Sequence, residues 1–409
     1  MSNNPIDICA PNRHVAPSNR WVKQMVKKFS GLQNGQLTIV LPRGGQVHLG
    51  QAQSGGPRAT LELKSYRPIS KLLLNGEVAF AQSYIDGEWD SPDLTALFDF
   101  ALANEKDVAA DTAGHWVSRA LHRVRHLLNR NSKSGSKRNI AYHYDLGNDF
   151  YAKWLDKSMT YSSALYETGA ETLRQAQHTK YQAIAEMLDL QMKDEVLEIG
   201  CGWGGFSELA ARDYGCFIHG LTLSREQLRY AQSRYQAAGI DQLASASYTD
   251  YRDSSGQYDK IVSIEMFEAV GEENWDTYFQ TVQDRLKPGG TAVLQIITIE
   301  EDRFETYRKG TDFIQRYIFP GGFLPSPSAL EDAVKRNGLT LQDTRFFGKS
   351  YARTCAAWQK QFQHTWSEIE PMGYDTAFKR MWEYYLSYCE AGFKAESVDV
   401  GLFKIVKPA

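Results

Sequence analysis

The chain has 409 residues, more than one ordinary hydrophobic core accommodates, and therefore predicts two domains. Its composition is that of a soluble globular protein, and a net charge of −3 argues against a nucleic-acid binder. The five cysteines show neither paired nor metal-ligand spacing, which indicates reduced thiols in a cytoplasm. The chain contains no run of about 18 apolar residues, so no membrane span is predicted. The polar N-terminus lacks the apolar run of a signal peptide.

The N-terminal third predicts a small mixed domain. Residues 1–20 are polar and predict a disordered tail. Residues 21–128 then form the domain, which shows no catalytic constellation. Its elements are predicted from helical spacing and from strand alternation as a helix at 20–29, strands within 35–50 and at 59–64, and helices at 71–86 and 96–103.

A basic stretch follows this domain. Between Arg119 and Arg138 there are seven Lys or Arg residues and no Asp or Glu. The pattern fits a solvated helix and linker, and it equally fits a cationic amphipathic surface that meets anionic lipid headgroups. By composition, 129–138 is a flexible basic linker, and 139–409 forms the catalytic domain.

A glycine-rich stretch from Asp194 to Gly205 organises the catalytic domain. Residues 195–199 predict a buried strand, and 206–214 predict a helix. The intervening glycines let a ligand lie against bare backbone, while the helix N-terminus offers N–H groups to an anionic part. Taken alone, such a stretch is equally consistent with a simple tight turn.

Strand and helix patterns alternate through the following hundred residues. Further strands are predicted at 216–221, 244–248, 259–264 and 291–297, and a helix at 172–188. This alternation predicts an α/β fold with a parallel sheet that is covered on both faces. Ligands bind at the carboxyl ends of such strands. That edge is predicted to hold Gly200, Thr222, Asp250, Glu265 and Gln295.

Carboxylates and aromatic residues supply the candidate chemistry. Glu265 and Glu268 follow the fourth strand, either as a base or cation stabiliser or as ordinary acids at a helix start. The apolar loop at 317–325 and the aromatic residues of a C-terminal helix either pack in the core or line a channel for a long apolar ligand. Those helix residues are Tyr384, Tyr385, Tyr388 and Phe393.

At these motifs the chain resembles the cyclopropane-fatty-acyl-phospholipid synthase family, over roughly residues 20–405. The small domain matches through Ser83–Trp89. The catalytic matches are His143–Asp149, Tyr161–Ser163, Leu197–Gly205, Gly220–Ser224, Ile261–Ile264 with Phe267–Glu268, Tyr317–Pro320 and Gly348–Tyr351.

The resemblance implies a class I, Rossmann-like methyltransferase that uses S-adenosylmethionine (AdoMet) and acts on unsaturated acyl chains of membrane phospholipids. It also suggests a homodimer. The basic stretch from Arg119 to Arg138 favours peripheral association with an anionic membrane surface on the cytoplasmic side. Asp250 and Tyr251 lie where such folds meet the adenine. By the family's pattern, the cofactor is held by Tyr144, Tyr161, Ser162, Gly200, Gly202, Thr222, Leu223 and Gln227.

The implied reaction needs a base. Methyl transfer to an alkene leaves a carbocation, which requires the exclusion of water and is stabilised by aromatic faces. Loss of a proton from the new methyl closes a cyclopropane ring. Loss from a neighbouring chain carbon instead gives a methyl-branched alkene.

The chain departs from the family at the base. Ring-forming members hold bicarbonate in a cage of Cys, Glu, His, a backbone carbonyl and Tyr. The Glu, carbonyl and Tyr correspond to Glu268, Ile297 and Tyr351. Ser163 stands at the Cys position, Gln295 at the His position, and Glu265 where a Gly is usual. Loss of a possible cation and gain of a carboxylate weaken the case for bicarbonate.

Three hypotheses follow from these residues. The favoured one makes Glu265 or Glu268 the base and a methyl-branched unsaturated chain the product. In the second, Ser163 and Gln295 still hold bicarbonate and a ring forms. In the third, the protein binds AdoMet or lipid without turnover.

Overall fold

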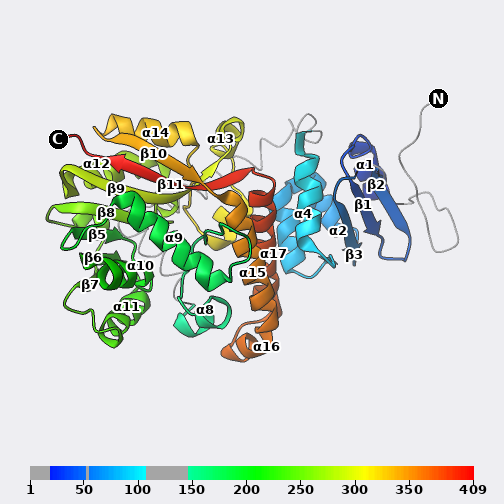
Figure 1. Cartoon of the computed structure of the whole chain (residues 1–409). Helices are drawn as coiled ribbons and strands as arrows, with labels where there is room; N and C mark the ends of the chain where they lie inside the picture. Colours follow the sequence, from blue (N-terminus) through cyan, green and yellow to red (C-terminus); the bar gives the residue numbers. More distant parts are fainter. Residues whose placement is uncertain (1–18, 52–54, 107–145) are drawn as a thin grey trace.

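The computed structural model describes residues 19–51, 55–106 and 146–409. Within these ranges the chain forms a four-stranded and a seven-stranded sheet, which lie toward opposite ends of the molecule with long helices between them (Figure 1). The basic stretch from Arg119 to Arg138 and the predicted cofactor residue Tyr144 lie outside the described residues, as does nearly all of the predicted tail.

The four-stranded sheet has the order β2-β1-β3-β4. Its strands are β1 (Gln36–Val40), β2 (Gln46–Gly50), β3 (Arg58–Leu63) and β4 (Trp89–Asp90). Its helices are α1 (Arg20–Lys28), α2 (Arg67–Asn75), α3 (Glu77–Ile85) and α4 (Leu94–Ala103). The helix expected at 71–86 is interrupted because Gly76, at φ +81°, ends α2 and begins α3.

The seven-stranded sheet has the order β10-β11-β9-β8-β5-β6-β7. Its strands are β5 (Glu195–Ile199), β6 (Phe217–Thr222), β7 (Ala244–Tyr248), β8 (Tyr258–Ile264), β9 (Leu286–Ile299), β10 (Thr340–Phe346) and β11 (Val398–Val406). The predicted strands β5 to β9 are parallel, as expected. Two further strands, β10 and β11, were not predicted and make the sheet mixed, because β11 pairs antiparallel with both β9 and β10.

Helices cover both faces of this sheet. Adjacent residues of β5 point to opposite sides: Val196 joins a hydrophobic cluster with α9, and Leu197 joins another with α12 and α14. The helix expected at 206–214 is α10, which widens into a π-helix at Ala210–Tyr214. The α-helices here are α8 (Asn148–Trp154), α9 (Leu173–Leu188), α10 (Gly205–Leu209), α11 (Arg225–Ala237), α12 (Trp275–Arg285), α13 (Glu301–Tyr307), α14 (Pro327–Arg336), α15 (Gly348–His364), α16 (Trp366–Ile369) and α17 (Thr376–Lys394).

Helix α17 joins the two halves of the molecule. It packs against α15 on one side and against α3 and α4 on the other (Figure 1). Its Arg380 donates to the backbone carbonyls of Tyr84 and Trp89, and its Tyr384 packs edge-on against Phe98. The N-terminal elements are thereby held against the helices that wall the cavity described below.

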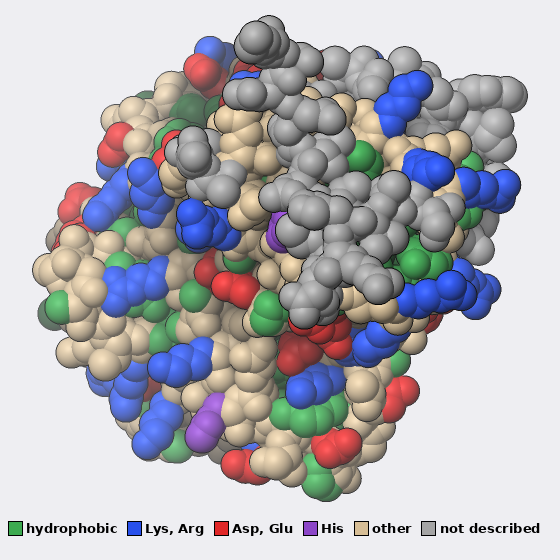
Figure 2. All heavy atoms as spheres, turned by 90° about the vertical axis from the view of Figure 1, so that its right-hand side faces the viewer, with side chains coloured by type: hydrophobic (Ala, Val, Ile, Leu, Met, Phe, Trp, Pro, Cys, Tyr) green, Lys and Arg blue, Asp and Glu red, His purple; other side chains and the backbone are tan. Residues whose placement is uncertain are grey.

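The outer face of the N-terminal elements is charged. Figure 2 shows Lys and Arg side chains in several groups across this face, with Asp and Glu side chains between them. Among the described residues, no helix has the length and apolar character needed to cross a bilayer.

Candidate active site

The glycine turn after β5 depends on backbone that only glycine adopts readily. Gly200 has φ +85°, and a Cβ there would lie 2.9 Å from Met266 Cγ. Gly204 has φ +80°, and its Cβ would lie 2.7 Å from the phenol oxygen of Tyr235. Between them, Gly202 faces open space on the wall of a large cavity. The turn therefore presents bare backbone to the cavity.

The cavity has a volume of about 730 Å³ and lies at the carboxyl ends of the parallel strands. With the exception of Asp250, the described residues predicted to hold the cofactor line this cavity. They are Tyr161, Ser162, Gly200, Gly202, Thr222, Leu223, Gln227 and Tyr251. Asp250 is 3% exposed and does not line the cavity, because its carboxylate accepts hydrogen bonds from the backbone and guanidinium of Arg252.

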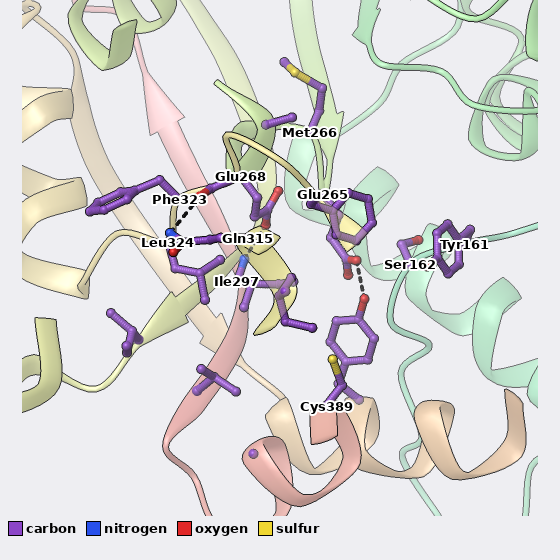
Figure 3. Close-up of a pocket in the computed structure, with 18 of the residues that line it drawn as sticks. Tyr161, Ser162, Glu265, Met266, Glu268, Ile297, Gln315, Phe323, Leu324 and Cys389 are labelled. Atoms are coloured by element: carbon purple, nitrogen blue, oxygen red, sulfur yellow. Dashed lines mark hydrogen bonds between the residues drawn. The ribbon is translucent and has the colours of Figure 1, made fainter. Parts of the chain in front are cut away.

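Glu265 occupies the centre of the site. It follows β8 at φ +50°, an uncommon conformation for a residue other than glycine. Its Oε1 accepts from the Ser163 N–H at 2.8 Å and from Gln295 Nε2 at 2.7 Å. Its Oε2 accepts from the Tyr351 hydroxyl at 2.6 Å, the bond drawn from Glu265 in Figure 3. Segments far apart in the sequence thus converge on one carboxylate.

Glu268 also lines the cavity, but its carboxylate has fewer hydrogen-bond donors than that of Glu265. One oxygen accepts from the Ile297 N–H at 2.6 Å, and the other is buried without a partner among the described residues. Burial, together with the negative charge of Glu265, raises the pKa of Glu268 to about 8. Burial also raises the pKa of Glu265, but its hydrogen bonds oppose that shift. The two carboxylates thus differ in their support: Glu265 has three hydrogen-bond donors that favour its ionised form, whereas Glu268 has one.

The structure brings Ser163 and Gln295 to the site, but behind the carboxylate and away from the cavity wall. The Ser163 hydroxyl donates to the Ala164 carbonyl, so the backbone N–H is what faces Glu265. Three expected members of an anion cage, Ser163, Gln295 and Tyr351, therefore surround the side chain of Glu265.

The rest of the cavity is largely apolar. Among its lining residues are Phe319, Phe323, Leu324, Tyr385, Tyr388 and Phe393. Of the two alternatives for the α17 aromatic residues, lining an apolar cavity holds for Tyr385, Tyr388 and Phe393. Tyr384 follows the other alternative, core packing, because its ring packs against Phe98 and Phe313. The cavity also reaches Glu77, Glu105 and Arg303, so residues of the N-terminal elements contribute to its wall.

Comparison with known proteins decides the family. The model of the mycolic acid cyclopropane synthetase family matches residues 131–403. The chain belongs to this family. It is 38% identical to the tuberculostearic acid methyltransferase UfaA1 of Mycobacterium tuberculosis over 341 residues, 81% of this chain and 79% of that one. It is 34% identical to the cyclopropane-fatty-acyl-phospholipid synthase of Escherichia coli K12 over 357 residues, 87% and 90% of the two chains.

A solved structure of the same family agrees. The crystal structure of the mycolic acid cyclopropane synthase CmaA1 complexed with SAH and CTAB superposes with a TM-score of 0.62 at 29% identity. The match covers 66% of this chain and 98% of that one. As a member of the cyclopropane synthetase family, the protein is an AdoMet-dependent methyltransferase with the class I fold.

The residues present fit AdoMet. The open backbone at Gly202 provides room at the glycine turn, and α10 begins directly beyond it. Thr222 donates to the side-chain oxygen of Gln227 at 2.9 Å, which leaves the Gln227 amide N–H groups as donors at the end of β6. Gln227 lies in the first turn of α11, where its N–H donates to the side chain of the N-cap residue Ser224. When bound, AdoMet would supply a transferable methyl group on a sulfonium.

Sequence reasoning missed two polar residues on α9. Lys180 Nζ donates to Ser162 Oγ at 2.7 Å, and Gln177 Nε2 donates to the Ser162 carbonyl at 2.8 Å. Both side chains are completely buried. The signal was present in the sequence, because both lie on the helical stripe that carries the apolar core residues Tyr181 and Ile184.

Proposed function

We propose that the protein transfers a methyl group from AdoMet to the double bond of an unsaturated acyl chain in a membrane phospholipid, leaving a methyl-branched unsaturated chain. The observation that carries this proposal is the position of Glu265. Its carboxylate receives hydrogen bonds from Ser163, Gln295 and Tyr351, at the place where an external anion would otherwise be expected. A base tethered to the chain thus stands in for a diffusible one.

The residues support the following chemistry. Addition of a methyl group to one alkene carbon leaves a positive charge on the other. The aromatic lining, including Tyr385 and Phe319, excludes water and presents ring faces to that cation. Glu265 accepts a proton from a neighbouring chain carbon, and the C–H electron pair forms the new double bond. The lipid gains one CH₂ in total, and the proton leaves Glu265 for solvent.

Ring formation is the second candidate. It is favoured by Glu268, Ile297 and Tyr351, which the resemblance assigns to a bicarbonate cage, and by the synthase name of the Escherichia coli relative. Against it, the Glu265 carboxylate already uses the Tyr351 hydroxyl as its donor. The Mycobacterium tuberculosis relative is named as a methyltransferase.

Product analysis separates the two candidates. The full-length protein is incubated with vesicles of unsaturated phospholipid and AdoMet bearing a trideuterated methyl group. The proposal expects a product that retains all three deuterium atoms and still contains a double bond, located by derivatisation and mass spectrometry. A product with two deuterium atoms and no double bond would overturn it, because the proton would then have left the new methyl to close a ring.

We further propose that the protein works as a homodimer bound peripherally to an anionic membrane surface. An acyl chain must leave the bilayer to reach the deep apolar cavity, and the exposed face of α1 carries Lys23 and Lys27. Sedimentation with anionic vesicles should fall as salt rises, and light scattering should give twice the chain mass. Salt-insensitive binding or a monomeric mass would contradict the respective proposal.

A further inference from the structure

Helix α9 carries a polar pair inside the hydrophobic core. Its buried stripe includes Ala176, Tyr181 and Ile184, together with Gln177 and Lys180. Lys180 and Gln177 are each 0% exposed. Burying an ammonium group is costly unless it is paired and hydrogen-bonded, so this arrangement calls for a specific role.

Both side chains end on one residue. Lys180 Nζ donates to the Ser162 hydroxyl, and Gln177 Nε2 donates to the Ser162 carbonyl. The next N–H along the backbone, that of Ser163, donates to the Glu265 carboxylate. Ser162 itself lines the cavity close to Glu265 (Figure 3). One bond from α9 therefore holds the peptide that orients the proposed base, and the other holds the Ser162 side chain beside it.

The charge of Lys180 acts on the same group. Carboxylates on three other segments raise the pKa of Lys180 through their charge: Glu265 after β8, Asp156 after α8 and Glu198 in β5. The ammonium lies 4.4 Å from the centre of the Tyr181 ring. Burial lowers the pKa of Lys180 to about 7, and Glu265 is the foremost of the carboxylates that oppose this shift. Burial raises the pKa of Glu198 to about 8, so Glu198 contributes little negative charge near neutral pH.

We propose that Gln177 and Lys180 are positioning residues for the base: Gln177 fixes the Ser162–Ser163 peptide, and Lys180 supplies the counter-charge that keeps Glu265 ionised. The proposal rests on the proposed role of Glu265 and deepens it. Neither residue needs to touch the substrate. Their effects should therefore differ in kind, because only one of them carries charge.

Matched variants separate geometry from charge. Lys180→Met removes the charge and the bond to Ser162, Lys180→Arg keeps the charge, and Gln177→Leu removes the other bond to Ser162 without changing charge. In Lys180→Met, the acid limb of the kcat/KM profile should move up by roughly one pH unit or more, which is the size of a nearby charge effect. At pH values below the limb this corresponds to about a tenfold loss, which is recovered at pH values above it.

The controls should behave differently. Gln177→Leu should lower turnover across the whole pH range and leave the acid limb at its parent position. Lys180→Arg, which keeps the charge, should have its acid limb closer to that of the parent protein than Lys180→Met does. An acid limb that does not move in Lys180→Met, or that moves equally in Gln177→Leu, would overturn the proposal. AdoMet affinity from calorimetry reports separately on disturbance of Ser162 in the cofactor cavity.

A measurement without catalysis makes the result independent of the reaction. Melting temperatures at pH 6, below the pKa of about 7 of Lys180, are compared for the parent protein, Lys180→Met, Glu265→Gln and the double variant. If the two charges interact, the double variant melts higher than the sum of the single shifts predicts. Additive shifts would overturn the inference whatever the product is. Conversely, a ring product together with non-additive shifts would refute the proposed function alone.

Discussion

Replacing Glu265 by Gln tests the base directly, because the substitution keeps the shape of the side chain. The amide oxygen can still accept a hydrogen bond from Tyr351, while the amide cannot take up a proton. General-base catalysis typically contributes about 10²–10⁴ in rate. Each tenfold change corresponds to about 1.4 kcal/mol of activation free energy, so Glu265→Gln should raise the barrier by about 3–5.5 kcal/mol.

The assay follows labelled methyl groups from AdoMet into vesicles of unsaturated phospholipid, in buffers with and without bicarbonate. The parent protein should be insensitive to bicarbonate, because its carboxylate is supplied by the chain. AdoMet affinity serves as the control that Glu265→Gln leaves the cofactor site intact. Turnover within threefold of the parent protein would refute the assignment of Glu265 as the base.

A second variant at the same position sharpens the test. Glu265→Gly relieves the left-handed backbone at φ +50° and opens a space that is bounded by Ser163, Gln295 and Tyr351. A small carboxylate such as formate or bicarbonate should fill that space and restore part of the activity. The rescue should saturate with anion concentration and be absent in Glu265→Gln, where the space stays filled.

The remaining predictions concern stability. Because the folded pKa of Glu268, about 8, lies above its unfolded value, its ionisation destabilises the fold as pH rises toward 8. Glu268→Gln should therefore melt higher than the parent protein at pH 8 and equally at pH 4, and should keep turnover within about tenfold. Gly204→Ala should cost about 1–3 kcal/mol in denaturant unfolding because its Cβ meets Tyr235, and more than Gly202→Ala, whose Cβ meets open space. Arg380→Leu removes the guanidinium donor of the Trp89 carbonyl and should lower the unfolding free energy by about 1–3 kcal/mol. Equal melting of Glu268→Gln and parent at pH 8, equal losses for the two glycine variants, or an unchanged midpoint for Arg380→Leu would contradict these expectations.

The sequence predicted the parts of the fold that local patterns specify. Strands β5 and β7 match their expected bounds because each is a short run between turn residues. Strand β10 was missed because most of its residues are exposed at the sheet edge, so it carries no hydrophobic alternation. Its pairing with β11 joins segments more than fifty residues apart in the sequence. No local pattern contains that information.

For the site, the sequence predicted which residues lie at the sheet edge but not how their polar groups are oriented. The sheet edge correctly located Gly200, Thr222 and Glu265, because parallel strands end on a common side. What sequence reasoning did not specify was the direction of each polar group. The Ser163 hydroxyl turns to the Ala164 carbonyl and leaves its N–H to the carboxylate, a choice set by side-chain packing rather than by residue type.

Glu265 also explains why a strained backbone is retained at the centre of the site. A side chain in the left-handed region costs about 1–2 kcal/mol relative to glycine, and burial of its charge costs more. Hydrogen bonds from Ser163, Gln295 and Tyr351 compensate for these costs only if the carboxylate stays ionised. The buried cation of Lys180 favours that state. Strain, hydrogen bonding and counter-charge therefore all favour one microscopic form of Glu265, the form that can accept a proton from a lipid cation.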